Sequence, residues 1–265
     1  DVSSSEKAGV AKSKFSTVAM RDYGKATNEL FTQFLARIAQ EIPTATVAMF
    51  SKLKYVNAPN FEKFRQVWQA KYLGGFVVPS KTFEGLSGNF PIGFLVWNTA
   101  KKEILKEISV NVLDKNINAI GEKSFYNLAN SNFLNTWIDR PKPNKQIVIP
   151  LKNTVSPAGS SKSSLIFWSD NALGYMRVSA NDIQHANQHT AFFSSTYSDA
   201  HGFYITPDNL WQAAVVFSVR RLIKPTWIND RDQFLQPTQP LTDEFKHDCL
   251  IWMLFHGSNL TASAN

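Results

Sequence analysis

The sequence predicts an α/β fold for residues 23–110 and an α+β region for residues 111–265. Up to residue 98, segments with apolar residues at helical spacing alternate with short apolar runs typical of buried strands. A stretch from Arg140 to Ser164 is then rich in Pro, Lys, Ser and Gly, which indicates loops. With 265 residues, of which 43% are hydrophobic, the chain is long enough to bury a substantial core.

The first elements are an arm and a helix. Residues 1–22 are polar and rich in lysine, so we expect a flexible basic arm. Thr27 is expected to cap a helix that Pro43 closes. The predicted apolar face of this helix consists of Leu30, Phe31, Phe34, Leu35 and Ile38.

A second helix and four strands are expected before residue 113. Asn60 can cap the helix, whose apolar face includes Trp68 and Tyr72, and Gly74 and Gly75 are expected to end it. Asn-rich loops are expected after the last strand, and the second and third strands are expected to form a hairpin. The strands are predicted at residues 46–50, 76–78, 92–97 and 104–112.

The second half contains short strand candidates followed by two helices. Thr206 is expected to open a helix that runs to about Ile223, and a last helix is expected to start near Thr242. The inward side chains of the last helix are predicted to be Phe245, Cys249, Trp252 and either Met253 or Phe255. The strands are predicted at residues 165–168, 174–178, 191–193 and 203–205.

Composition indicates a polyanionic partner and a reducing compartment. The formal net charge is +7 and the pI is about 9.4, which favours nucleic acid as a partner. Cys249 is the single cysteine, so an internal disulfide is excluded and a cytoplasmic location is expected. The apolar runs are much shorter than the roughly 20 residues of a membrane-spanning helix, so no membrane partner is expected.

Six segments between Gly24 and Asn98 follow one another in a distinctive order. They are a helix with Asn28-x-x-Phe31-x-x-Phe34, an apolar strand, a helix with Phe61-x-x-Phe64-Arg65, a strand ending at Pro79, a loop with Phe83, and the apolar run to Trp97. This order resembles the part of an adenine-specific (N6) DNA methyltransferase of a restriction-modification system that follows the catalytic Asn-Pro-Pro-aromatic loop. The later segments resemble the downstream portion of the same enzymes.

The resemblance implies the C-terminal portion of a Rossmann-like methyltransferase sheet, with residues 111–265 adjoining target recognition. The complete enzyme would transfer a methyl group from S-adenosylmethionine to adenine N6 in DNA. This sequence contains neither Pro-Pro nor a glycine-rich turn after a first strand. We therefore expect no catalytic, cofactor-binding or metal-binding residue in this chain and no activity from it alone. The expected partners are DNA and either a missing N-terminal catalytic portion or a separate catalytic subunit.

The resemblance also implies residues that contact DNA. Phe83, with Phe90 as the competing candidate, would stack against the target adenine after the base leaves the duplex. The alternative is a phenylalanine that plugs the edge of the sheet. Phosphate contacts, or simply solvated surface positions, are predicted for Lys52, Lys54, Arg65, Lys71 and Lys81.

Other interpretations of the sequence remain open. One is a noncatalytic DNA-binding or assembly module of a restriction-modification complex. Another is a magnesium-dependent nuclease that uses Asp232, Glu244 and Lys246, although the run from Thr242 to Glu244 also makes an ordinary capped, acid-rich helix start. His185 and His189 have a metal-ligand spacing, but polar surface histidines are the preferred interpretation.

Overall fold

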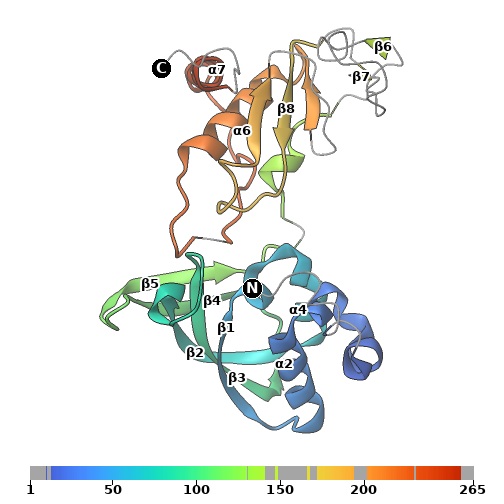
Figure 1. Cartoon of the computed structure of the whole chain (residues 1–265), viewed down its shortest axis with the longest axis vertical. Coiled ribbons are helices and arrows are strands. Elements are labelled where there is room, and N and C mark those ends of the chain that lie inside the picture. The colour runs from blue at the N-terminus through green and yellow to red at the C-terminus, as the bar shows by residue number, and fades with distance from the viewer. Residues whose placement is uncertain are drawn as a thin grey trace. The chain divides into compact units, whose positions relative to one another are not determined.

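The computed structural model describes residues 10, 13–129, 131–140, 147–148, 166–167, 172–193, 202–229 and 231–257, with only the backbone at 147–148 and 166–167. The chain forms two compact units, each with its own helices and strands (Figure 1). The first consists of Asp1–Ser131 and Thr226–Asp232, and the second of Asn132–Pro225 and Gln233–Asn265. The predicted α/β class is confirmed at this level. None of the helices in the described ranges is long and apolar enough to cross a bilayer.

A five-stranded mixed sheet, in the order β1-β3-β2-β4-β5, organises the first unit. β3 is antiparallel to both β1 and β2, so the predicted hairpin of the second and third strands is confirmed. β2 and β4 are parallel, and β4 and β5 are antiparallel. The strands are β1 (Thr46–Lys52), β2 (Ala70–Pro79), β3 (Pro91–Lys102), β4 (Glu107–Leu113) and β5 (Ala119–Tyr126).

The helices of the first unit lie between and before these strands. Because β1 and β2 both run against β3, they are parallel to each other, and the helices between them complete a split β-α-β arrangement. In Figure 1, α2 and α4 lie on the same side of the curved sheet. The helices are η1 (Phe15–Ala19), η2 (Arg21–Asn28), α2 (Leu30–Glu41), α3 (Lys54–Asn57), η3 (Pro59–Phe61), α4 (Glu62–Val67) and η4 (Ser80–Thr82).

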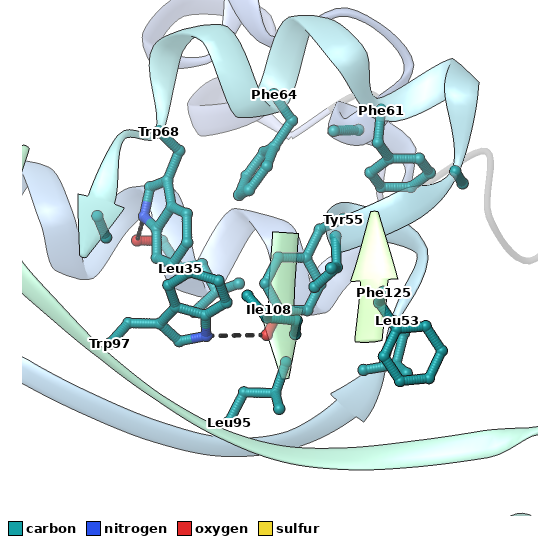
Figure 2. Close-up of a cluster of buried hydrophobic side chains, with 14 of the residues drawn as sticks. Leu35, Leu53, Tyr55, Phe61, Phe64, Trp68, Leu95, Trp97, Ile108 and Phe125 are labelled. Carbon is teal, nitrogen blue, oxygen red and sulfur yellow. Dashed lines mark hydrogen bonds between the residues drawn. The ribbon is translucent and has the colours of Figure 1, made fainter. Parts of the chain in front are cut away.

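An aromatic core joins these helices to the sheet (Figure 2). The Trp97 indole nitrogen donates a hydrogen bond to the Tyr55 hydroxyl at 3.1 Å, and the Trp68 indole donates to the Leu35 carbonyl at 3.1 Å. Both buried indole donors are therefore satisfied, as burial of polar groups requires. Burial also raises the pKa of Tyr55.

The predicted apolar face of the first helix is wrong in part. Leu30 and Phe34 are each 54% exposed, whereas Thr32 and Gln33 are buried. The cause is the preceding η2, because the carbonyl groups at its end need donors. The Thr32 hydroxyl donates to the Ala26 and Glu29 carbonyls, and the Gln33 amide donates to the Thr27 carbonyl at 2.8 Å. The helix begins after Glu29, not after a Thr27 cap.

The two glycines expected to end the second helix lie inside β2 instead. α4 already ends at Val67. Gly74 has φ +149° at a register shift between β2 and β3, and a Cβ on Gly75 would lie 2.3 Å from the Phe94 carbonyl oxygen. These glycines therefore permit a bulge and a close approach of neighbouring backbones.

The first unit also extends beyond its predicted range on both sides. β5 forms where Asn-rich loops were expected, and the predicted boundary at residue 110 falls inside β4, so the unit continues to Ser131. Within the expected basic arm, residues 13–22 form helical turns with Met20 fully buried. Residues 1–9, 11 and 12 lie outside the described residues.

The second unit contains a three-stranded antiparallel sheet with the order β10-β8-β9. Its core combines this sheet with α6, α7 and η5. Among the core residues, Met176 belongs to β8, Phe217 to α6 and Leu134 to η5. The predicted strands near 174–178, 191–193 and 203–205 are confirmed. The elements are η5 (Leu134–Thr136), β6 (Ile147–Val148), β7 (Ile166–Phe167), β8 (Gly174–Val178), β9 (Thr190–Phe193), β10 (Gly202–Ile205), α6 (Leu210–Leu222) and α7 (Asp243–His256).

The last helix begins as the sequence predicts but is only partly buried. The Thr242 hydroxyl accepts a hydrogen bond from the Phe245 backbone amide, which confirms the expected cap. Cys249 and Met253 are buried against the core. Phe245 is exposed, so the prediction that it points inward is wrong, and of the alternatives Met253 and Phe255 it is Met253 that is buried. α7 therefore packs against the unit through a narrow stripe of side chains that includes Cys249 and Met253.

Candidate nucleic-acid contact surface

The carboxyl ends of the parallel strands β1 and β2 meet at one edge of the first unit. Lys52 of β1 and Val78 of β2 both lie opposite Ile92 at the start of β3. The loop between β2 and β3 is closed at its base by Ser80, whose backbone amide donates to the Phe90 carbonyl at 2.8 Å. In α/β sheets, ligands bind beyond the carboxyl ends of parallel strands. This edge is therefore a candidate ligand-binding site.

Four phenylalanines gather on the sheet face beside this loop. Phe50, Phe94 and Phe76 lie opposite one another in a single row across β1, β3 and β2. Ring centroids are 4.8 Å apart for Phe50 and Phe94 and 5.4 Å apart for Phe76 and Phe94. Phe83, from the loop, packs edge-on against Phe50 at 5.3 Å. We call Phe50, Phe76, Phe83 and Phe94 the phenylalanine cluster.

The cluster leaves aromatic surface accessible to solvent. Phe50 is 48% exposed, and Phe83 is half-buried. Phe50 was not among the residues predicted from sequence, although its place in the apolar run of residues 46–50 was the available signal. Its neighbours became evident only from the register of β1 on β3.

The two aromatic candidates predicted from sequence have different surroundings. Phe83 extends the accessible cluster, whereas Phe90 is buried with Val78 and Ile92 in a small apolar group. A base could reach the Phe90 ring only if the loop moved. The structure thus favours Phe83 over Phe90 as an accessible ring.

Two of the predicted lysines lie near these rings. The Lys52 ammonium lies 4.4 Å from the centroid of the Phe90 ring, a cation–π contact. Lys81 is exposed in η4, two residues before Phe83. We call Phe83, Lys52 and Lys81 the loop-end site.

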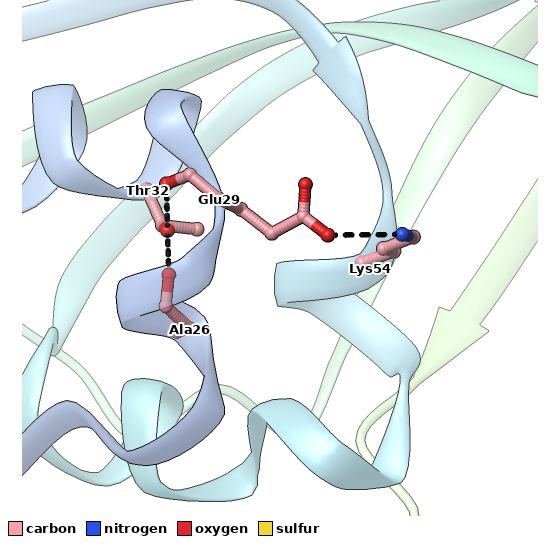
Figure 3. A network of polar contacts seen from close by, with 4 residues as sticks. All are labelled: Ala26, Glu29, Thr32 and Lys54. Atoms are coloured by element: carbon pink, nitrogen blue, oxygen red, sulfur yellow. Dashed lines mark hydrogen bonds and ion pairs between the residues drawn. The ribbon is translucent and has the colours of Figure 1, made fainter. Parts of the chain in front are cut away.

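Two further lysines are paired with acids. Lys54 contacts Glu29 at 3.1 Å, in the network that also contains Thr32 (Figure 3). Lys71 contacts Glu103 at 3.6 Å and lies at the opposite end of β2 from the loop. A strand rises about 3.3 Å per residue, so Lys71 is far from the loop-end site.

Arg65 is the predicted DNA contact whose surroundings differ most from the expectation. Its residue is 4% exposed. Nε donates to the Asn127 side-chain oxygen at 2.8 Å, and Nη1 donates to the Ala58 carbonyl at 2.9 Å. Burial lowers the pKa of Arg65 to about 10, which still leaves it charged at neutral pH. In this conformation the guanidinium ties α4 to neighbouring backbone and is not placed to contact a phosphate.

The residues of the nuclease interpretation have other partners. Asp232 contacts Lys123 at 2.6 Å within the first unit. Lys246 contacts Asp243 at 2.9 Å within the second unit, where Glu244 also lies. Asp232 and Glu244 therefore belong to different units.

Metal binding by the histidine pair has no support in the described ranges. His185 and His189 stack with ring centroids 5.2 Å apart, in the turn between β8 and β9. Burial is the main cause that lowers the pKa of His189. Among the residues that the structure describes, no three His, Cys, Asp or Glu side chains are grouped to hold a metal ion.

Comparisons with known protein families, with curated proteins and with solved structures found no match. The half-buried aromatic ring of the loop-end site offers a surface for stacking a planar group, and its two cations offer charge for phosphates. Glu84 is the one acidic residue in the sequence of the loop from Ser80 to Phe90. Such a set of side chains is suited to binding nucleotides.

Proposed function

We propose that this chain is part of a site-specific DNA adenine-N6 methyltransferase of a restriction-modification system, and that its first unit contacts DNA and the target base. The observation that carries the proposal is the loop-end site. Phe83 and Lys81 lie in a loop at the carboxyl ends of two parallel strands, beside Lys52. Phe83 would replace the stacking that an adenine loses on leaving the duplex, and the lysines would hold the flanking phosphates.

The order of elements supports the same proposal. α2, β1, α4, β2, the Phe83 loop and β3 follow one another as the resemblance requires. Among the strands that the structure describes, β1 is at the end of the order, so its outer edge can pair with a further strand. We propose that the rest of a Rossmann-like sheet pairs at this edge, supplied by an N-terminal catalytic portion or by a separate subunit. The second unit would adjoin target recognition.

The residues present do not fit S-adenosylmethionine. In Rossmann-like sheets a glycine-rich turn after a strand lets the backbone approach the cofactor. Here β1 is followed by Leu53 and then directly by α3, with no glycine in the connection. We therefore assign the cofactor and the methyl-transfer step to the catalytic portion or subunit, and we expect the isolated chain to be inactive.

The role of Phe83 is tested with DNA that contains an unpaired adenine. Because an unpaired base costs less to extrude, the wild-type chain is expected to bind a duplex with one adenine opposite an abasic site more tightly than the fully paired duplex. Phe83→Ala is expected to weaken binding to the first duplex by roughly five- to a hundredfold, since stacking on one aromatic side chain is lost. Fluorescence anisotropy of labelled duplexes measures both affinities.

Leu86→Ala is the matched control because Leu86 is an exposed apolar residue of the same loop. Phe83→Trp should retain the preference, since it keeps a ring. An unchanged preference in Phe83→Ala would show that the ring only packs against Phe50. An open reading frame upstream that encodes an Asn-Pro-Pro-aromatic motif would favour the methyltransferase over the noncatalytic module.

The lysines of the loop-end site are tested by the salt dependence of duplex binding. Each lysine that neutralises a phosphate contributes about 0.9 to the slope of log affinity against log salt concentration. Lys52→Ala and Lys81→Ala are each expected to reduce that slope by about this amount. Lys71→Ala, at the far end of β2, is expected to leave it unchanged. Equal slopes for the wild type and the three variants would show that neither Lys52 nor Lys81 contacts a DNA phosphate.

A further inference from the structure

A pocket of about 460 Å³ opens in the second unit. It lies where the starts of α6 and α7 meet the segment of residues 237–241. Its volume is within the range of roughly 300–1,000 Å³ that is typical of small-molecule sites. All of its lining residues belong to the second unit.

Two indoles supply aromatic walls of this pocket. Trp137 follows η5, and Trp211 lies in the first turn of α6. Trp211 is 36% exposed, and its ring is held edge-on against His247, with centroids 5.0 Å apart. Val215 and Leu241 add apolar surface. The Trp211 ring is thus partly fixed in orientation, while part of its surface stays accessible to solvent.

Polar groups accompany the indoles. Gln212 and Gln239 line the pocket and carry amides with both a donor and an acceptor. Lys246 also lines it and is held at 2.9 Å from the exposed carboxylate of Asp243. Thr238 lies on the exposed segment that borders the opening.

We propose that this pocket binds the base of an unpaired nucleotide in single-stranded DNA. Indole rings bind the face of any base by stacking. Glutamine amides match the donor and acceptor edge of adenine. A proline-rich peptide also uses aromatic grooves, but it has no planar edge for two amides.

The proposal rests on the proposed function for its choice of DNA and adds a second contact, distinct from the loop-end site. It gives the second unit a contact for an unpaired base, the form in which a nucleotide leaves the duplex. The sequence supports a polyanionic partner through its net charge of +7.

The test measures binding of a labelled single-stranded d(A)12 to the full chain by fluorescence anisotropy. Trp211→Ala removes one wall, and Thr238→Trp fills the opening from an exposed position. Each is expected to weaken d(A)12 binding about fivefold or more, because one stacking contact is lost or blocked. Phe255→Ala, which alters an 83% exposed residue of α7 outside the pocket lining, is the matched control and should bind like the wild type. Circular dichroism and thermal unfolding verify that each variant is folded.

The outcomes separate this proposal from that for the loop-end site. Loss of d(A)12 binding in Trp211→Ala and Thr238→Trp, with wild-type binding in Phe83→Ala, supports the pocket even if the duplex experiments fail. Wild-type affinity in a folded Thr238→Trp, or no d(A)12 binding by the wild-type chain, overturns it. Displacement of d(A)12 by a proline-rich peptide that itself binds more tightly also overturns it.

Discussion

Replacing Arg220 with methionine is expected to destabilise the second unit by about 2–4 kcal/mol, because the Thr190 hydroxyl and the Ser179 carbonyl lose a donor, and the Ala180 carbonyl keeps only that of Asn135. Arg220 is fully buried. Its guanidinium donates to the Ser179 carbonyl at 2.9 Å, the Ala180 carbonyl at 3.1 Å and the Thr190 hydroxyl at 2.7 Å. Methionine fills similar space but donates nothing to them.

The cost of burying the charge does not reverse this expectation. Burial lowers the pKa of Arg220 to about 10, so removing the charge relieves some desolvation. The Thr190 hydroxyl, however, is buried at the start of β9, and the Ser179 carbonyl is half-buried on the connection between β8 and β9. An unpaired buried acceptor costs roughly 1–3 kcal/mol. The lost hydrogen bonds should therefore outweigh the relieved desolvation.

Cys249 provides a measurement specific to the second unit. It is the single cysteine of the chain, it is buried in the core of that unit, and burial raises the pKa of its thiol. Thiol labelling during urea titration therefore reports when the unit opens. Lys224→Ala, which changes an exposed cation just after α6, is the control. Equal midpoints for Arg220→Met and the wild type would contradict the structural role of Arg220.

Arg65→Met is expected to destabilise the first unit by about 3 kcal/mol, through the loss of its hydrogen bonds to the Asn127 side chain and the Ala58 carbonyl. Arg65→Lys is expected to recover only part of this loss. A lysine keeps the charge but lacks the planar fork that reaches two acceptors in fixed directions. Hydrogen exchange of residues 46–102, followed by mass spectrometry, measures the opening of this unit.

The lysine variant also separates the structural role of Arg65 from the predicted DNA role. If the side chain served mainly as a phosphate contact, Arg65→Lys would leave stability unchanged and retain the salt slope of duplex binding. The buried position predicts instead that stability falls in Arg65→Lys, and that the folded fraction of both variants binds DNA with an unchanged slope. A slope reduced by about 0.9 in Arg65→Met alone would restore Arg65 as a DNA contact.

The functional residues differ in how far sequence could identify them. Phe83 and Lys81 are close in the chain, so their shared loop was predictable. Lys52 joins them only because β1 and β2 end beside the same strand. Trp137 and Trp211 are more than seventy residues apart in the sequence, and no local pattern marks them as neighbours.

By itself, the sequence determined the features that depend on near neighbours. The apolar runs around Met49 and Leu95 indicated strands, and the run around Leu95 is largely buried, as an apolar run with both faces covered should be. Thr242 indicated the start of the last helix, because its hydroxyl caps an amide three residues away.

The tertiary structure alone decided the features that depend on distant partners. β5 is mostly exposed and lacks an apolar run, so its pairing with β4 left no local signal. Gly75 lies in a strand because the Phe94 carbonyl approaches it, and Arg65 is buried because Asn127 lies beside it. These outcomes follow from hydrogen bonds and packing between residues far apart in the chain, which local propensity and periodicity do not contain.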